Sequence, residues 1–266
     1  MKQQHGYQLI IQKPNQKLTN SRTFTLPLLI AFALTVMLSA CGTTGPATGA
    51  KQKDEKLSVF MVFSERERAG TPLFRSSMYV NDDYIYISDD SSDDGYILFD
   101  RQKQTIYSVS HSNKSIFVIK PKEIKIKSPI AIDYQAAAQP SSAIPKVSGR
   151  TATHYRYDAN GEHCYDAVTL EKSFLPGVVK ALKEYRMVLA GEHASTVLKM
   201  PKDTHEACDL AVNIFHATQH LDTGLPLREW DQKGYLKFMV DYKIGFNFDK
   251  NKLTLPADYR QFSVTQ

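Results

Sequence analysis

The apolar residues of this chain recur in short runs from residue 57 to residue 120, and the gaps between the runs carry Asn, Asp, Ser, Gly and Lys. The runs are rich in β-branched and aromatic residues and follow one another at intervals of roughly ten residues, which is typical of an antiparallel meander. The predicted strands are 57–63, 73–80, 84–87, 96–99, 105–109 and 115–119. Alternation in 105–109 is imperfect, so we expect both faces of the sheet to be partly covered.

Residues 121–150 interrupt this rhythm with four prolines, at positions 121, 129, 140 and 145. This composition predicts a connecting segment, in which a short strand at 124–127 stays open as an alternative. Strand character returns at 153–158, and the dipeptide Asn160-Gly161 favours a tight turn into a second strand at 162–168. The pattern therefore predicts a hairpin that carries Cys164.

After Pro176 the apolar period lengthens to that of a helix. Val178, Leu182, Tyr185 and Leu189 lie at i, i+4, i+7 and i+11, which predicts an amphipathic helix that begins near Pro176. A second helix is predicted from residue 203, where the first turn is acidic, through Phe215. Strands are then predicted at 227–231 and 235–244 around a Lys233-Gly234 turn, and 255–259 closes the chain.

These elements predict an α+β fold, in which a curved antiparallel β-meander carries a two-helix insertion. We expect a single domain over 57–266, because its length suits one large core. Its expected parts are the meander (57–120), a connector (121–150), a β-hairpin (151–170), the helical insertion (171–220) and closing strands (221–266).

The N-terminal region has a different pattern. A lead with four basic and no acidic residues is followed by an apolar run at 24–37 and by Leu38-Ser39-Ala40-Cys41. A basic lead, an apolar run too short for a comfortable membrane span and small residues at a cleavage point are typical of a secretory signal. The last four residues resemble the bacterial lipobox, which implies that residues 1–40 are removed and that the sulfur of Cys41 is acylated. Residues 41–56 then form a flexible tether.

Two alternatives to this signal are a plain cleaved signal peptide and an uncleaved anchor. Neither needs a cysteine after Leu-Ser-Ala, and we therefore favour lipidation at Cys41. Two or more acyl chains give stable anchoring, because each buried methylene contributes roughly 0.8 kcal/mol. By resemblance to enterobacterial lipoproteins, Gly42 in place of Asp directs the protein to the outer membrane, on its periplasmic side.

Removal of the signal changes the charge of the chain. The whole sequence has 33 Lys and Arg against 28 Asp and Glu, and four of these cations but none of the anions lie in residues 1–40. The remaining 29 cations and 28 anions nearly balance. A nearly neutral chain offers no electrostatic argument for a nucleic-acid partner.

The two remaining cysteines, Cys164 and Cys208, would lie in an oxidising compartment, and a disulfide between them is the simplest interpretation. A zinc site made with His163 and His205 is the alternative. Adjacent ligands such as His163 and Cys164 are geometrically awkward, and the paired spacing of zinc sites is absent. We therefore predict a disulfide and neither a metal nor another cofactor.

Two further patterns are candidates for chemical sites. Asp90, Ser92 and Asp94 match the first ligands of a calcium loop, but Arg101 stands where the loop needs a bidentate Glu, so we favour a solvated acidic turn over weak calcium binding. His216 and His220 are four residues apart on a helix, but no third metal ligand is fixed. No hydrolase motif such as Gly-x-Ser-x-Gly or His-Glu-x-x-His occurs in the sequence, so we predict no catalytic residues.

The strand succession 78–80, 96–101 and 106–109 resembles small periplasmic proteins of the lipoprotein-carrier type (LolA/LolB-like). The resemblance implies an open half-barrel with helices across its concave side. The meander aromatics then line an apolar cleft for an acyl chain or form a complete core, and we favour the core because unfilled apolar surface is costly. These aromatics are Phe60, Phe63, Phe74, Tyr84, Tyr86, Phe99, Tyr107 and Phe117.

The sequence thus predicts a noncatalytic outer-membrane lipoprotein that faces the periplasm and binds a hydrophobic ligand or an envelope protein. The alternatives are an envelope hydrolase with a nonstandard site and a purely structural envelope component.

Overall fold

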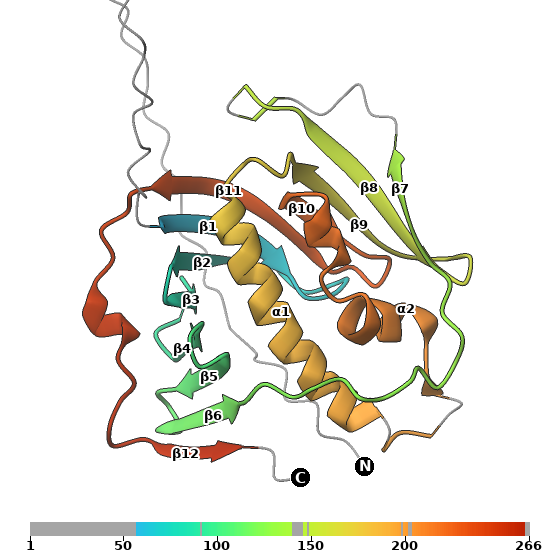
Figure 1. The fold of residues 1–266 in the computed structure, drawn as a ribbon. Helices are drawn as coiled ribbons and strands as arrows, with labels where there is room; N and C mark the ends of the chain where they lie inside the picture. The colour runs from blue at the N-terminus through green and yellow to red at the C-terminus, as the bar shows by residue number, and fades with distance from the viewer. Residues whose placement is uncertain are drawn as a thin grey trace, which may run out of the picture. The chain divides into compact units, whose positions relative to one another are not determined.

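The computed structural model describes residues 57–90, 92–139, 146–147, 149–197, 199–201 and 204–263. The expected signal, the tether and Cys41 lie outside the described residues. Twelve strands form one sheet in the order β12-β6-β5-β4-β3-β2-β1-β11-β10-β9-β8-β7, which is not closed into a barrel (Figure 1). The strands are β1 (Ser58–Arg66), β2 (Phe74–Asn81), β3 (Tyr84–Asp89), β4 (Gly95–Asp100), β5 (Thr105–Ser110), β6 (Ser115–Ile119), β7 (Tyr134–Gln139), β8 (Ala152–Ala159), β9 (Glu162–Leu170), β10 (Leu225–Trp230), β11 (Leu236–Ile244) and β12 (Arg260–Ser263).

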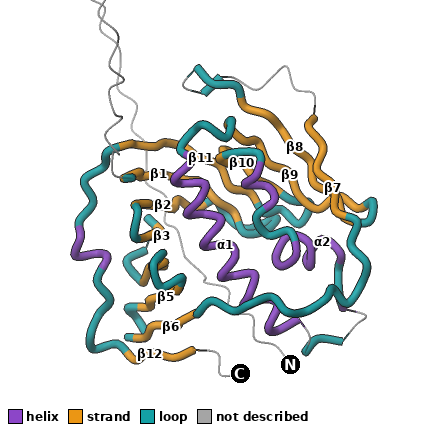
Figure 2. Tube along the Cα trace, viewed as in Figure 1, coloured by secondary structure: helices purple, strands orange, loops and turns teal. Residues whose placement is uncertain are grey.

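The helical elements separate β9 from β10 in the chain (Figure 2). They are α1 (Pro176–Val197), α2 (Ala207–Leu210), the π-helical turn η2 (Ala211–Phe215) and the 3-10 turn η3 (Gln219–Asp222), and a further 3-10 turn, η4 (Lys250–Leu253), follows β11. α1 contacts β2, β5, β6 and β10, whereas α2 contacts β8 and β9. The structure therefore confirms the sheet with a helical insertion. Among the described residues, no helix has both the length and the apolarity needed to cross a membrane.

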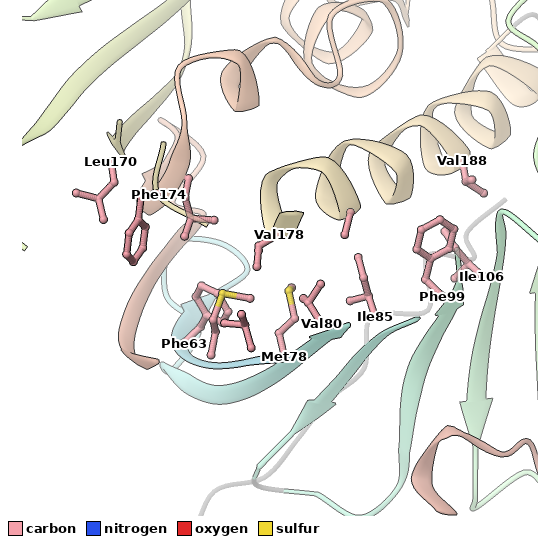
Figure 3. Close-up of a cluster of buried hydrophobic side chains, with 14 of the residues drawn as sticks. Phe63, Met78, Val80, Ile85, Phe99, Ile106, Leu170, Phe174, Val178 and Val188 are labelled. Atoms are coloured by element: carbon pink, nitrogen blue, oxygen red, sulfur yellow. The ribbon is translucent and has the colours of Figure 1, made fainter. Parts of the chain in front are cut away.

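The main core lies between α1 and the sheet (Figure 3). Val59, Met61, Val80, Ile85 and Phe99 of the strands are at most 1% exposed. Val178 of α1 is fully buried against them, and Leu182, Tyr185 and Leu189 are partly buried in the same cluster. The four residues predicted to form the apolar face of the helix therefore do so.

The other face of the meander has its own apolar layer. Tyr79, Tyr86 and Leu98 point to this side, where the chain after β11 covers them. The rings of Phe246 and Phe60 stack at 4.6 Å, and those of Phe248 and Tyr79 stack at 4.2 Å. The expectation that both faces are covered is confirmed.

Two expectations about the connections are wrong, and one alternative that was left open is not formed. β12 pairs with β6 in parallel, so the sheet is mixed rather than wholly antiparallel. The predicted connector contains β7, whose Ala-rich sequence has weak strand propensity and which is held by antiparallel pairing with β8. Residues 124–127 form no strand, because Ile124 and Ile126 pack against the end of α1 and η2 instead.

The hairpin turn and the second helix were predicted with different success. Asn160 and Gly161 join β8 to β9 with φ angles of 52° and 81°, as the Asn-Gly signal predicted. The second helix is shorter than predicted: it begins at Ala207 and changes to a π-helical turn at Ala211. Residue 203, the predicted start, lies outside the described residues.

Candidate functional site

An open cavity of about 830 Å³ lies beside the disulfide, and we call it the polar cleft. This volume is within the range of small-molecule sites, which is roughly 300 to 1,000 Å³. The polar cleft is lined by Glu67, by Glu162, His163, Cys164 and Tyr165 of β9, by Arg186 of α1, by Glu206, Cys208, Asp209, Val212 and Asn213 around α2, and by Asp231, Gln232, Lys233 and Tyr235 of the β10–β11 hairpin.

A β-bulge turns the start of β9 toward the polar cleft. Tyr157 pairs with Tyr165 and Asp158 pairs with His163, which leaves Cys164 as the extra residue. Because a bulge reverses the alternation of side chains, Cys164 and Tyr165 both point to the helical side of the sheet. There Cys164 forms a disulfide with Cys208 of α2, with a Cα–Cα distance of 5.2 Å. The predicted disulfide is confirmed, and it fixes α2 at the edge of the polar cleft.

A cluster of buried polar groups lies beside the polar cleft. Tyr165 donates a hydrogen bond to Oε1 of Glu229, and Nε2 of His220 lies 3.8 Å from the same oxygen. Glu229 is 9% exposed and His220 is 5% exposed. Arg186 reaches toward this cluster from α1 and also lines the polar cleft. A buried carboxylate therefore lies close to a guanidinium, a phenol and an imidazole.

The burial of these groups fixes their protonation. Burial, reinforced by the positive charge of Arg186, lowers the pKa of His220 to about 3, so its ring is neutral. Burial and the charge of Glu229 raise the pKa of Tyr165 well above its usual value, so its hydroxyl keeps the proton that it donates. Burial opposes the charge of Arg186, but Glu229 and the surrounding tyrosines together outweigh burial, and the pKa of the guanidinium is raised.

The buried carboxylate belongs to a row of charged residues that crosses the sheet. Glu229 pairs with Lys237, and Lys237 pairs with Glu65, so all three lie on the helical face. Nζ of Lys237 lies 3.0 Å from Oε1 of Glu65 and 4.3 Å from the centre of the Phe63 ring. Alternating charges allow this row to be buried without leaving one sign uncompensated.

A second polar cluster is centred on Asp166, and two of its members, His163 and Gln232, also line the polar cleft. Asp166 is 4% exposed and its two oxygens lie 2.7 Å from Nε2 of His154 and 2.6 Å from Nε2 of His163. The contact to His154 has the geometry of a hydrogen bond, whereas the contact to His163 does not. Gln232 holds the other ring nitrogen of His163 at 2.8 Å.

The zinc alternative for the cysteines fails, because both sulfurs are used in the disulfide. The calcium candidates are likewise occupied by protein groups. Asp90 accepts a hydrogen bond from Ser77 and pairs with Arg75, and Asp94 accepts one from the backbone N–H of Ser112. Oγ of Ser92 accepts the N–H of Asp94. Within the described parts of the chain, no group of three or more His, Cys, Asp or Glu is placed to hold a metal.

His216 and His220 do not share a site. The ring of His216 stacks on Tyr134 at 4.6 Å, whereas His220 is directed toward Glu229. Among the described residues, no Ser or Thr hydroxyl makes a hydrogen bond to a histidine ring. The paired nucleophile and base of a serine hydrolase are therefore not formed there.

The meander aromatics do not line one cleft. Phe63 and Phe99 belong to the core under α1, whereas Phe60, Tyr84, Tyr86 and Tyr107 belong to the layer on the other face. Phe117 lies 5.3 Å from Phe262 of β12, and Phe74 is half-buried. None of the eight lines the polar cleft. The complete core is thus the better interpretation of these residues.

Sequence reasoning missed Arg186 and Glu229, the two charged residues of the buried cluster beside the polar cleft. The apolar period alone places Arg186 on the polar face of α1. A usable signal existed in β10, where Glu229 follows Leu227 at the two-residue period of an inward-facing strand position. A charged residue at such a position is rare unless it has a partner.

Comparison with known proteins gives no family for the chain. No family model and no curated protein matches it. Among solved structures, PNGF-II in two crystal forms aligns at TM-scores of 0.40 and 0.38 with 9% identity over 78% of this chain, and an uncharacterised conserved protein from Thermus thermophilus aligns at 0.38 with 8% identity over 78% of this chain and 90% of its own. The chain spans about a third of PNGF-II, at 31% and 32% in the two forms. Because these likenesses are weak, the function is inferred from the site alone.

Proposed function

We propose that this chain is an outer-membrane lipoprotein, anchored through Cys41, whose periplasmic body binds a small polar ligand in the polar cleft without transforming it. We further propose that the open sheet is a half-barrel of the lipoprotein-carrier type. The observation that carries the proposal is the polar cleft, a cavity of about 830 Å³ whose lining includes Arg186 and five carboxylate side chains. Because ten of its fifteen lining residues are charged, amide or imidazole side chains, the open cavity supports a polar ligand rather than the hydrophobic ligand that the carrier resemblance implies.

The arrangement of the core supports the same choice. The apolar layers on both faces of the meander are filled by α1 and by the chain after β11. An acyl chain would have to displace these side chains, at a cost of about 25 cal/mol for each Å² of apolar surface exposed. A polar ligand enters the polar cleft without such a rearrangement.

The anchor is tested by fractionation of cells that express Cys41→Ala. We expect the wild type in the outer membrane and the variant absent from it, because the acylated sulfur is lost. Retention of the variant in the outer membrane would contradict the proposed anchor and would leave the cleft proposal to be judged by its own experiment.

Ligand binding is tested by filling the polar cleft. The full chain in detergent is incubated with an extract of envelope metabolites, and the retained compounds are identified by mass spectrometry. We expect the wild type to retain a polar compound that Asn213→Trp does not retain. Val240→Trp, at a site that is 53% exposed, is the matched control and should retain it. Retention of no compound by the wild type would overturn the proposal, and recovery of a chemically altered compound would favour the hydrolase alternative.

A further inference from the structure

Arg186 has hydrogen-bonding capacity that the protein does not use. Its guanidinium is surrounded by protein, but the side chain is partly exposed because it lines the polar cleft. In the part of the chain that the structure describes, it makes no hydrogen bond and no ion pair within 4 Å. A guanidinium has five N–H donors, and none of those of Arg186 is paired with a protein acceptor among the described residues. Water or a ligand in the polar cleft therefore supplies their acceptors.

A negative charge nearby balances that of Arg186, but no protein group pairs with its guanidinium among the described residues. Glu229 supplies the negative charge, but Oε1 of this carboxylate already accepts the hydroxyl of Tyr165 and faces His220. The protein thus stabilises a positive charge at this position while it leaves the planar donor edge unoccupied. Such an edge matches two oxygens of one acid group, because carboxylates and phosphates accept paired N–H donors from arginine.

The remaining charges of the polar cleft decide between these two acids. Five carboxylates line it, against Arg186 and Lys233, and Lys233 is paired with Glu206 at 2.7 Å. The unpaired excess is negative, and it includes Glu67 and Glu162 at exposed positions. An acidic surround repels a doubly charged phosphate but attracts a ligand that carries an ammonium group beside its carboxylate.

We infer that the polar cleft binds a zwitterion, an amino acid or a short peptide, whose carboxylate is held by Arg186 and whose ammonium group lies among the surrounding carboxylates. This inference rests on the proposed function, because it names the ligand of the same cavity. The volume of about 830 Å³ leaves room for a peptide of a few residues.

The experiment uses the full chain in detergent and a mixture of the standard amino acids with a random tripeptide library. After equilibrium dialysis, retained compounds are quantified by mass spectrometry. The same library with C-terminal amides and the same library with acetylated N-termini are dialysed in parallel, together with inorganic phosphate. We expect free zwitterions to be retained at least about tenfold more than the amides, since hydrogen bonds to a charged group are lost. The acetylated library should lose retention by a smaller factor.

The protein side is tested with Arg186→Gln and Arg186→Lys. We expect Arg186→Gln to retain free peptides no better than the wild type retains amides, and Arg186→Lys to recover part of the difference, because the charge returns without the paired donors. Arg228→Gln is the matched control, since Arg228 is exposed beside Trp230, and it should leave retention unchanged. The comparison of ligands on the wild type stands even where a variant at 186 does not fold.

Equal retention of free and amidated peptides would overturn the inference, as would preferential retention of phosphate. If no peptide is retained but an envelope metabolite still binds in the Asn213-dependent manner described above, the proposed function stands and only the zwitterion is wrong. If neither screen yields a compound, both are wrong.

Discussion

The same helix covers two chemically different regions of the sheet. Over β1–β6, α1 presents Val178, Ala181 and Tyr185 to a layer of apolar side chains that excludes water. Over β9–β11, it presents Arg186 to a buried carboxylate, a neutral imidazole and an open polar cavity. Two adjacent residues of α1 thus face different environments: Tyr185 packs in the apolar core, and Arg186 lines the polar cleft.

Stability and the proposed ligand binding therefore depend on different regions of this molecule. Apolar burial contributes about 25 cal/mol per Å² and holds the meander together. Buried charges are seldom net stabilising, because desolvation offsets their attraction. The charged region must therefore be held by other means, and the structure provides the disulfide to α2 and the pairing of β9, β10 and β11.

The largest expected effect lies in the apolar region. Phe99 is fully buried, and its ring meets Tyr185 edge to face at 5.7 Å. Phe99→Ala should lower the free energy of unfolding by about 3 to 5 kcal/mol, because the cavity cannot collapse completely. Urea unfolding followed by circular dichroism measures the change.

Phe262 of β12, which is 46% exposed, is the matched control for this substitution. Phe262→Ala should change the free energy of unfolding by less than about 1 kcal/mol, because less surface is buried there. A similarly small loss for Phe99→Ala would mean that the layer under α1 is loosely filled, and would revive the apolar cleft for an acyl chain.

A smaller loss of stability is expected when the disulfide that holds the charged region is removed. The double variant Cys164→Ala/Cys208→Ala opens a loop between residues 44 apart in sequence. It should lower the free energy of unfolding by about 2 to 4 kcal/mol, chiefly because the unfolded chain gains freedom. Urea unfolding of the oxidised wild type and of the variant gives this difference.

Reduction of the wild type is the control, because it opens the same loop without a substitution. The reduced wild type and the double variant should unfold at the same urea concentration. Unchanged stability in both would show that α2 is held by packing alone, and the disulfide would then serve only to shape the polar cleft.

The sequence predicts the apolar region better than the charged one for a physical reason. Strand alternation and the helical period of Val178, Leu182, Tyr185 and Leu189 are local signals, and burial follows directly from them. The Asn160-Gly161 turn is local too. The parallel pairing of β12 with β6 is not, since most of the chain's helices and strands lie between the two in sequence and either edge of the sheet could have accepted the last strand.

The polar cleft depends on contacts of the same long-range kind. Tyr165, Arg186, His220 and Glu229 come from four elements, and nothing in the local sequence of any one of them indicates the others. The disulfide could be predicted because only two cysteines follow the expected signal and Cys41, and the compartment that this signal implies is oxidising. The bulge that turns Cys164 and Tyr165 to the same side has no comparable signal.

The smallest and most specific effect concerns the protonation of His220. Its pKa is about 3 in the folded protein, because burial and then Arg186 disfavour its charge, and it returns to about 6.5 on unfolding. Between these values the unfolded chain binds a proton that the folded chain does not. The stability that the neutral ring contributes is therefore complete above about pH 6.5. It decreases as the pH is lowered, by up to about 1.4 kcal/mol per pH unit.

His220→Gln isolates this contribution from the other titrating groups. Urea unfolding at about pH 7 and about pH 5 should show the wild type losing more stability than the variant, whereas His193→Gln, at an exposed helical position, should follow the wild type. Parallel losses in wild type and His220→Gln would mean that the folded imidazole takes up the proton. A charged His220 would then pair with Glu229 and repel Arg186. In that case Glu229 would no longer hold the guanidinium of Arg186 in place for a ligand.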